Sequence, residues 1–421
     1  MKKIFSLLFF SLAALSVQAQ TSREEVCANL DKAGGVYLVY PEPTEALTPA
    51  PKGYAPFYIS HYARHGSRYL ISDRDYGWVM TLLEKAQKQQ ALSAFGQEVL
   101  ERLHNIWPLV EGRGGDLTPK GVRQHQGIAE RMYRNFPAVF KGDRSVSARS
   151  TVVLRCAMSM TAFGDQLKGL APNLSISYEA SEKYMNYLNY HADEANLFTH
   201  RQNGPWVCEY QKFARERLHP ERMVSALFSS QDFIRRNVNE IDLMWGFYWI
   251  AVDMQDIDTD IRFYDVFTPD EMFELWQCNS YCFYASDANH TGSRGLTVGN
   301  AKNLLRNIVE SADEAIADNS KAATFRFGHD GNVIPLLAIL GIEDFNVELS
   351  GPEKAYEKWA DFKAAPMAAN VQIVFFRNKA NHVIVKVLHN EREVHIPVKT
   401  DNFPYYNWTD VRDFYLSILQ K

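Results

Sequence analysis

Two strand-like runs that each lead into a histidine limit what this chain can fold into more than any other feature. The run Ala55–His61 is apolar and β-favouring, and it leads into Arg64-His65-Gly66. The run 323–327 leads in the same way into Gly328-His329-Asp330. Because open α/β sheets place ligand sites at the carboxyl ends of their strands, we expect the two histidines to contribute to one site.

The residues around the first histidine favour phosphate as the ligand. Arg64 and Arg68 flank His65, and a guanidinium is a planar, permanently charged fork that matches phosphate oxygens. The string Arg-His-Gly-x-Arg is expected by chance in roughly one chain of this length per thousand, so it is informative before any family is considered. The stretch therefore predicts a site that holds a phosphate and attacks it.

The remaining pattern predicts an α/β fold, with a central, mostly parallel sheet flanked by helices. Helical spacing occurs at 75–90, 92–107, 151–170, 301–317, 333–340 and 409–419, and Thr118-Pro119 marks a helix start that runs to about Phe136. Further β patterns occur at 144–148, 174–178, 371–377, 382–388 and 393–398, and residues 21–53 are expected to be an extended lead-in. The stretch 182–289 is aromatic-rich and helical, so we expect an inserted helical subdomain in an α/β domain made of 20–181 and 290–421.

The N-terminus has the pattern of a secretory signal. Lys2-Lys3 precedes the apolar run 4–15, and Val17-Gln18-Ala19 is a small-residue cleavage site. We therefore expect residues 1–19 to be removed and the mature protein to be periplasmic or secreted. No membrane span is expected, because a span takes about 20 apolar residues. With 45 basic and 50 acidic residues the net charge is -5, so no nucleic-acid partner is expected and any phosphate affinity must be local.

The cysteines and histidines give no metal signature. No spacing among them resembles a zinc site, and we expect neither a metal nor another cofactor. Cys278 and Cys282 are close enough to pair across a turn, but two buried thiols on one helix explain the spacing equally well.

The order of four motifs resembles the histidine acid phosphatase family, the exported branch of the histidine phosphatase superfamily. The matching segments are Arg64-His65-Gly66-x-Arg68, Leu117–Gln124, Arg149-Ser150-Thr151 with Arg155, and Gly328-His329-Asp330. The resemblance implies that His65 attacks phosphorus and carries a phosphohistidine, and that Asp330 is the general acid. It also implies which groups hold the phosphoryl oxygens, namely Arg64, Arg68, Arg155 and His329.

Each implied role has a structural alternative. Arg64 could belong to a structural ion pair, Arg149 is the rival of Arg155, and His329-Asp330 could simply cap a helix. For substrate binding the candidates are Arg74, Lys183 and Arg294, which could equally be surface charges. Family members of the multiple-inositol type often carry His-Ala-Glu where this chain has His329-Asp330-Gly331, which leaves the leaving group open.

The leading hypothesis is an exported acid phosphatase that hydrolyses small-molecule phosphomonoesters through phosphohistidine, with phytate or other inositol polyphosphates as candidate substrates. A glucose-1-phosphatase-like or broad acid phosphatase is the alternative within the same class. A phosphate-ligand binding protein is the alternative outside it, and export argues against a phosphoryl mutase.

Overall fold

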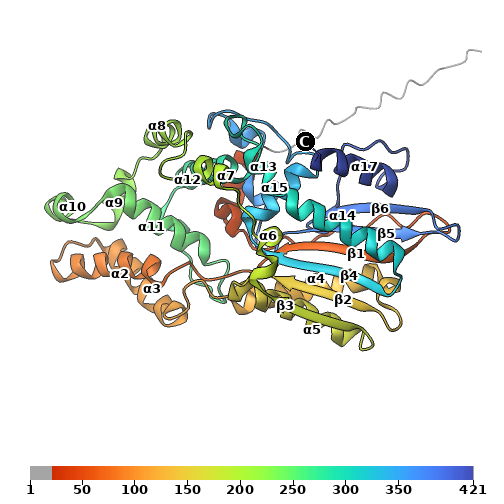
Figure 1. The fold of residues 1–421 in the computed structure, drawn as a ribbon. Coiled ribbons are helices and arrows are strands. Elements are labelled where there is room, and N and C mark those ends of the chain that lie inside the picture. The colour runs from red at the N-terminus through yellow and green to blue at the C-terminus, as the bar shows by residue number, and fades with distance from the viewer. Residues whose placement is uncertain (1–20, 421) are drawn as a thin grey trace, which may run out of the picture.

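An eight-stranded mixed sheet organises the molecule, which is described for residues 21–420 in a computed structural model (Figure 1). Four strands form its parallel half, in the order β3 (Ser175–Ala180), β2 (Ser145–Ser150), β4 (Lys321–Gly328) and β1 (Ala55–Arg64). The antiparallel half follows with β5 (Asn370–Arg377), β6 (Val383–His389) and β7 (Arg392–Glu393), and β8 (Tyr405–Asn407) also pairs with β6. The expected α/β class is confirmed, and the parallel strands form the core of a mixed sheet. The predicted signal segment lies outside the described residues.

Helices cover both faces of the sheet (Figure 1). One face carries α4 (Pro119–Asn135) and α5 (Leu154–Leu170), and the other carries α14 (Lys302–Ala317) and α17 (Trp408–Leu419). Helix α4 begins where the sequence predicted, because the Thr118 hydroxyl accepts a hydrogen bond from the Gly121 amide at 3.1 Å and Pro119 occupies the first helical position. Helix α15 (Asp330–Ile339) starts two residues after β4 ends and continues the chain away from the sheet edge.

A layer of helices lies beside the sheet, on the left in Figure 1. Between β3 and β4 the described chain contributes no strand to the sheet and consists of helices and loops. The elements there are η3 (Glu182–Tyr184), α6 (Met185–Leu188), α7 (Asp193–Thr199), α8 (Val207–Arg217), α9 (Glu221–Leu227), α10 (Gln231–Asn237), α11 (Glu240–Asp253), η4 (Tyr264–Val266), α12 (Pro269–Asp287), η5 (Thr291–Ser293) and α13 (Leu296–Gly299). The layer also includes α2 (Asp73–Lys88) and α3 (Ala94–Val110), since the Ser93 amide donates to the Leu227 carbonyl at 3.0 Å. The boundaries 182–289 remain a prediction.

Three local expectations are settled by the structure. The lead-in is not extended throughout, because Thr21 and Glu24 form a capping box that starts α1 (Ser22–Ala28), followed by η1 (Leu30–Tyr37). The strand expected at 393–398 is wrong: β7 ends at Glu393, and Pro397 has no amide hydrogen to give a ladder. Cys278 and Cys282 are free, buried thiols on α12, as the second of the two alternatives predicted.

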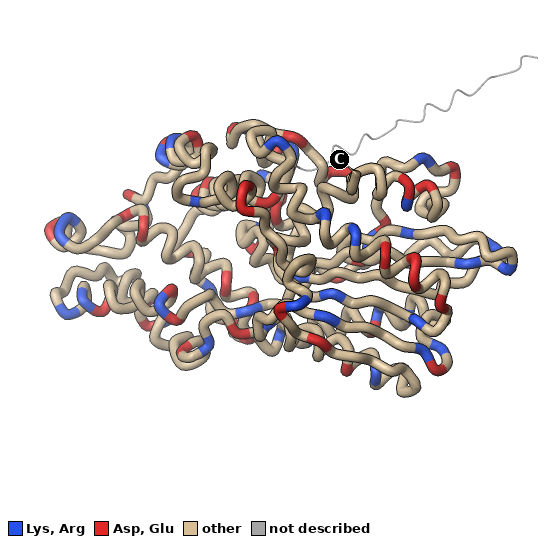
Figure 2. Tube along the Cα trace, viewed as in Figure 1, with Lys and Arg blue, Asp and Glu red and all other residues tan. Residues whose placement is uncertain are grey.

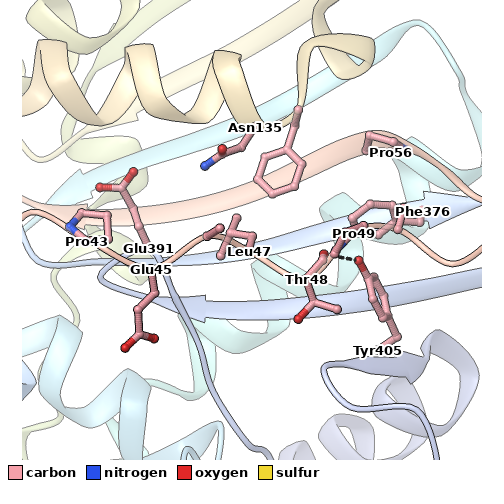
Figure 3. A pocket seen from close by; sticks show the side chains of 13 residues that line it. Pro43, Glu45, Leu47, Thr48, Pro49, Pro56, Asn135, Phe376, Glu391 and Tyr405 are labelled. Carbon is pink, nitrogen blue, oxygen red and sulfur yellow. Dashed lines mark hydrogen bonds between the residues drawn. The ribbon is translucent and has the colours of Figure 1, made fainter.

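The segment 43–50 crosses the antiparallel half of the sheet and leaves a cavity of about 280 Å³ beneath it (Figure 3). The Tyr405 hydroxyl donates to the Thr48 carbonyl at 2.9 Å, and the Thr48 amide donates to the Glu393 carboxylate at 2.7 Å, so side chains of the sheet hold the segment in place. None of the predicted site residues lines this cavity. The candidate site lies instead at the carboxyl ends of the parallel strands.

Charged residues of both signs are interspersed over the helices and strands, as Figure 2 shows. No long stretch of one sign stands out along the trace in this view, in keeping with the net charge of -5. Within residues 21–420, no helix is both long enough and apolar enough to cross a membrane.

Candidate active site

Three neighbouring parallel strands end at the same level and bring the sequence motifs together. Arg64, the last residue of β1, pairs with Gly328, the last residue of β4, and the end of β2 lies beside β4 in register. His65 and His329 therefore follow adjacent strand ends, and their ring centroids lie 5.7 Å apart at 71°. The His65 amide donates to the Gly328 carbonyl at 2.9 Å, which fixes the backbone between the two motifs.

His65 is held as a neutral ring in one tautomer. Its Nδ1 lies 2.8 Å from the carbonyl oxygen of Gly66, and because a carbonyl can only accept, Nδ1 carries the hydrogen. The lone pair is then on Nε2. Burial lowers the pKa of His65 well below its usual value, and Arg64, Arg155, Arg68 and His329 lower it further by charge repulsion. The ring therefore stays unprotonated in acid, with the lone pair on Nε2 available.

Arg64 is fully buried and bonded on two sides. Its Nη1 donates to the carbonyls of Val36 and Ala365, the latter at 2.8 Å, and its Nη2 lies 3.0 Å from Asp330 Oδ2. The ion pair that was the structural alternative for Arg64 is therefore present. It does not remove Arg64 from the site, because the partner is itself one of the candidate catalytic groups.

Arg68 and Arg155 are the other two cations at this edge. Arg68 donates to the Tyr37 hydroxyl at 2.7 Å and to the Tyr69 carbonyl at 2.8 Å, and its guanidinium stacks 4.7 Å from the Tyr37 ring centroid. Arg155 lies on the first turn of α5, and its shielded Nε has no hydrogen-bond partner among the described residues. Burial and the neighbouring Arg68 lower the Arg155 pKa. An anion bound beside this guanidinium would therefore stabilise its charged form.

Arg149, the rival of Arg155, is engaged elsewhere. Its Nε donates to Glu179 at 3.0 Å and its Nη1 to the Tyr187 hydroxyl at 3.2 Å, while the guanidinium stacks over the Tyr184 ring at 4.2 Å. These contacts give Arg149 a structural place beside β3. The geometry therefore favours Arg155 as the third cation near His65.

His329 and Asp330 occupy the start of α15. His329 is the N-cap residue but makes no side-chain cap bond, and its Nε2 instead lies 3.3 Å from the Thr151 hydroxyl and 3.7 Å from Cys156 Sγ. Burial lowers the pKa of His329 to about 4, with Asp330 opposing and the arginines reinforcing the shift. Burial alone would raise the pKa of Asp330, but Arg64, His329 and Arg68 outweigh it and hold this pKa at about 2.

No hydrogen bond or ion pair in the described chain links the side chains of the three candidate substrate residues to this cluster. Arg74, Lys183 and Arg294 are all exposed. Lys183 lines a separate cavity of about 340 Å³ with Arg149 and Arg306, and Arg74 lines a shallow one beside Trp78 and Trp107. Arg294 lies in a left-handed turn with a φ of 51°. Their contribution to substrate binding remains a prediction.

Several residues that support the site were not singled out from the sequence. Tyr37 contacts Arg68, Ser159 accepts from the Gly66 amide at 3.1 Å, and Asp256 accepts from Ser67 at 2.5 Å. No local motif marks them, because each acts through a contact between distant parts of the chain. In the part of the chain that the structure describes, no group of three His, Cys, Asp or Glu side chains is arranged to hold a metal ion.

This fold and this arrangement of two histidines and three arginines define a class of phosphate-handling enzymes. The family model of the histidine phosphatase superfamily (branch 2) matches residues 62–390, and the chain belongs to that superfamily. The resemblance seen in the four motifs is thereby confirmed.

Relatives with known names point in the same direction. Multiple inositol polyphosphate phosphatase 1 of Gallus gallus is 22% identical over 408 residues, covering 90% of this chain and 85% of that protein. The structure of Bifidobacterium longum multiple inositol polyphosphate phosphatase with inositol hexasulfate is similar with a TM-score of 0.78 at 20% identity, covering 90% of this chain and 97% of that one. The phytase from D. castellii has a TM-score of 0.64 at 15% identity, with 93% and 85% covered. At these identities the structural likeness establishes the fold.

Proposed function

We propose that this protein is an exported acid phosphatase that hydrolyses phosphomonoesters through a phosphohistidine at His65, with inositol polyphosphates such as phytate as its substrate class. The single observation that carries the proposal is the His65 ring itself. It is buried among cations, keeps its hydrogen on Nδ1 toward the Gly66 carbonyl, and leaves Nε2 as a free lone pair at the end of β1.

The surrounding charges fit in-line displacement at phosphorus. Arg64, Arg68 and Arg155 would bind the phosphoryl oxygens and stabilise the charge on the transferring group. Nε2 of His65 forms a bond to phosphorus while the ester oxygen leaves, and Asp330 gives that oxygen a proton. Water then attacks the phosphohistidine, its proton passes to Asp330, and inorganic phosphate is released with the imidazole restored.

Inositol polyphosphates are favoured as substrates by relatives named as multiple inositol polyphosphate phosphatase and phytase. The Asp330-Gly331 pair in place of Ala-Glu keeps the glucose-1-phosphatase-like or broad acid phosphatase reading as the second candidate. A phosphate-release panel of phytate, glucose 1-phosphate and an aryl phosphate separates these two. Preferred release from phytate supports the first candidate.

The decisive experiment is His65→Ala, assayed with an aryl phosphate at acid pH together with trapping of the radiolabelled phosphoenzyme. We expect loss of both turnover and label. The matched control is His104→Ala, which removes an exposed histidine on α3 and should keep both. Retained turnover in His65→Ala would contradict the proposal. Binding of inositol phosphate by the wild type with no release of phosphate would make the protein a binding protein instead.

A further inference from the structure

The loop that follows His65 is anchored by a carboxylate from the helical layer. Asp256, just after α11, accepts a hydrogen bond from the Ser67 hydroxyl at 2.5 Å, although the two residues are 189 positions apart in the sequence. Gln124 of α4 completes the anchor, because its amide nitrogen donates to the Ser67 hydroxyl at 2.8 Å and its amide oxygen accepts from the Ser67 backbone at 2.8 Å. Ser67 and Asp256 are fully buried, so these contacts are not exchanged with water.

A second carboxylate fixes the other end of the same loop. The Tyr76 hydroxyl donates to Asp253 at 2.5 Å and accepts from the Leu70 amide at 2.9 Å. Asp253 is the last residue of α11 and is also fully buried. The loop is thus held at Ser67 and at Leu70, and Arg68 lies between the two anchors.

The two buried acids lie three residues apart at the end of α11. The Asp256 amide donates to the Asp253 carbonyl at 2.9 Å, so both side chains leave one tight turn. Each has one oxygen, Asp253 Oδ1 and Asp256 Oδ2, without a partner in the described chain. Burial raises the pKa of both acids, and repulsion from Asp253 raises that of Asp256 further.

The charged and titratable groups that face the pair come from several elements. They include Arg64 and Arg68 from the β1 end, Tyr76 and Asp75 from α2, and Ser67 as a neutral hydrogen-bond donor. Tyr37 also lies near Asp253 and Tyr264 near Asp256, and Lys120 of α4 donates to the carbonyls of Gln255 and Ile257. Arg68 and Arg64 favour the ionised form, and Asp75 opposes it at Asp253. A single negative charge on the pair would balance part of the positive charge of Arg68.

We propose that Asp253 and Asp256 are positioning residues for the phosphate-binding loop, residues 66–70, which they hold at two points through Ser67 and Tyr76. The inference rests on the proposed function, because it assigns these residues to the presentation of Arg68 and His65 to phosphate. The inference also gives the helical layer a defined part in the site, because the two carboxylates at the end of α11 hold the loop that follows β1.

The test measures the affinity for inorganic phosphate by calorimetry, together with kcat and KM for an aryl phosphate. Asp256→Ala and Ser67→Ala both break the anchor, and we expect each to weaken phosphate binding about tenfold or more, since small displacements of positioning groups are costly. Asp256→Asn should recover most of that loss, because its amide oxygen can still accept the hydrogen bond from the Ser67 hydroxyl. Ser67→Ala removes a single oxygen atom, so it can test the same anchor if the Asp256→Ala variant does not fold.

Two further variants separate positioning from simple stability. Tyr76→Phe cuts the link between Asp253 and the Leu70 amide and should weaken phosphate binding in the same direction. Glu391→Gln alters another buried carboxylate, bonded to Tyr40 and Arg131, that makes no contact with the loop. It should lower the thermal midpoint and keep the phosphate affinity.

Wild-type phosphate affinity in both Asp256→Ala and Ser67→Ala would overturn the positioning role while leaving the proposed function intact. So would equal losses in these variants and in Glu391→Gln, because the effect would then be one of stability. A wild-type protein that neither binds phosphate nor hydrolyses the aryl ester would overturn both proposals.

Discussion

At the scale of single residues, the pair of Arg64 and Asp330 poses the main question of mechanism. The two side chains lie 3.0 Å apart, and the pKa of Asp330 is held at about 2, so the free protein carries a carboxylate there in mild acid. A general acid must be protonated when the leaving group departs. A phosphate group that arrives between the arginines competes for Arg64 and brings negative charge, and both effects raise the pKa of Asp330. Substrate binding and proton uptake by Asp330 are therefore expected to be coupled.

Asp330→Asn tests this role through the leaving group. We expect kcat to fall about 100-fold or more with an alkyl phosphate, whose alkoxide needs a proton, but much less with p-nitrophenyl phosphate, whose phenolate leaves unaided. Steady-state rates with the two esters give the comparison. Asp318→Asn, which alters an exposed carboxylate near the start of β4, is the control. Equal losses with both esters would show that Asp330 binds the substrate without acting as an acid.

The residues that sequence reasoning could name are those that carry their meaning in a short motif. Arg64, His65 and Arg68 lie within five positions, and His329-Asp330 are adjacent, so strand ends and residue types were enough to find them. Tyr37 and Asp256 have no such signal. They matter because folding brings them to Arg68 and Ser67 across 31 and 189 positions, and only the tertiary structure specifies those contacts.

At the scale of elements, α4 and the loop after His65 meet at two glycines. A Cβ at Gly121 would lie 2.3 Å from the Ser67 carbonyl oxygen, and one at Gly66 would lie 2.5 Å from the Gly121 carbonyl oxygen. Both contacts are with backbone, which cannot swing aside as a side chain can. The start of α4 thus packs closely against the loop 66–70.

Gly121→Ala should therefore damage both stability and activity. The added methyl group forces α4 and the loop apart, and we expect a loss of about 1–3 kcal/mol in the free energy of unfolding with a fall in kcat/KM of about tenfold. Urea unfolding and aryl phosphate hydrolysis measure the two effects. Gly169→Ala is the matched control: it lies in α5 with open space around its Cβ position and should stabilise the protein by about 0.5–1 kcal/mol. An active, stable Gly121→Ala variant would contradict the close contact.

Elements with strong local signals were predicted from the sequence, and those fixed by distant contacts were not. The helix after Thr118-Pro119 was found because cap and proline act within one turn. The turn at Gly35, with a φ of 57°, was not predicted, because the need for glycine comes from a residue far away in the sequence. A Cβ at Gly35 would lie 2.1 Å from the Asp361 carboxylate. The expected strand at 393–398 failed since alternation alone cannot tell whether a partner strand exists.

At the scale of the whole molecule, the site collects groups from along most of the described chain. Strand ends contribute His65 and His329, α5 contributes Arg155, and η1 contributes Tyr37. The helical layer contributes the buried acids beside the loop. Loss of packing in either layer is therefore expected to displace members of this cluster.

The same compact arrangement buries two histidines outside the candidate site, and their titration is expected to limit stability in acid. His61 lies in the core with its ring stacked 5.2 Å from Phe163, and His125 lies 5.6 Å from Phe327. Burial lowers the pKa of His61 well below its usual value and that of His125 to about 3. In the unfolded chain both take up a proton near pH 6.5, so the free energy of unfolding should fall as the pH drops from about 6.5 toward 3.

His125→Leu tests this limit, because leucine cannot take up a proton in either state. Each buried neutral histidine contributes a slope of up to about 1.4 kcal/mol per pH unit, so the wild type should lose roughly 2 kcal/mol more than the variant between pH 7 and pH 4.5. Urea unfolding at the two pH values measures the difference, and His104→Leu, at an exposed position on α3, should behave like the wild type. Parallel losses in all three proteins would place the acid sensitivity in the carboxylates instead. Bound phosphate should offset part of the loss in the wild type, because a ligand that binds only the folded state stabilises it.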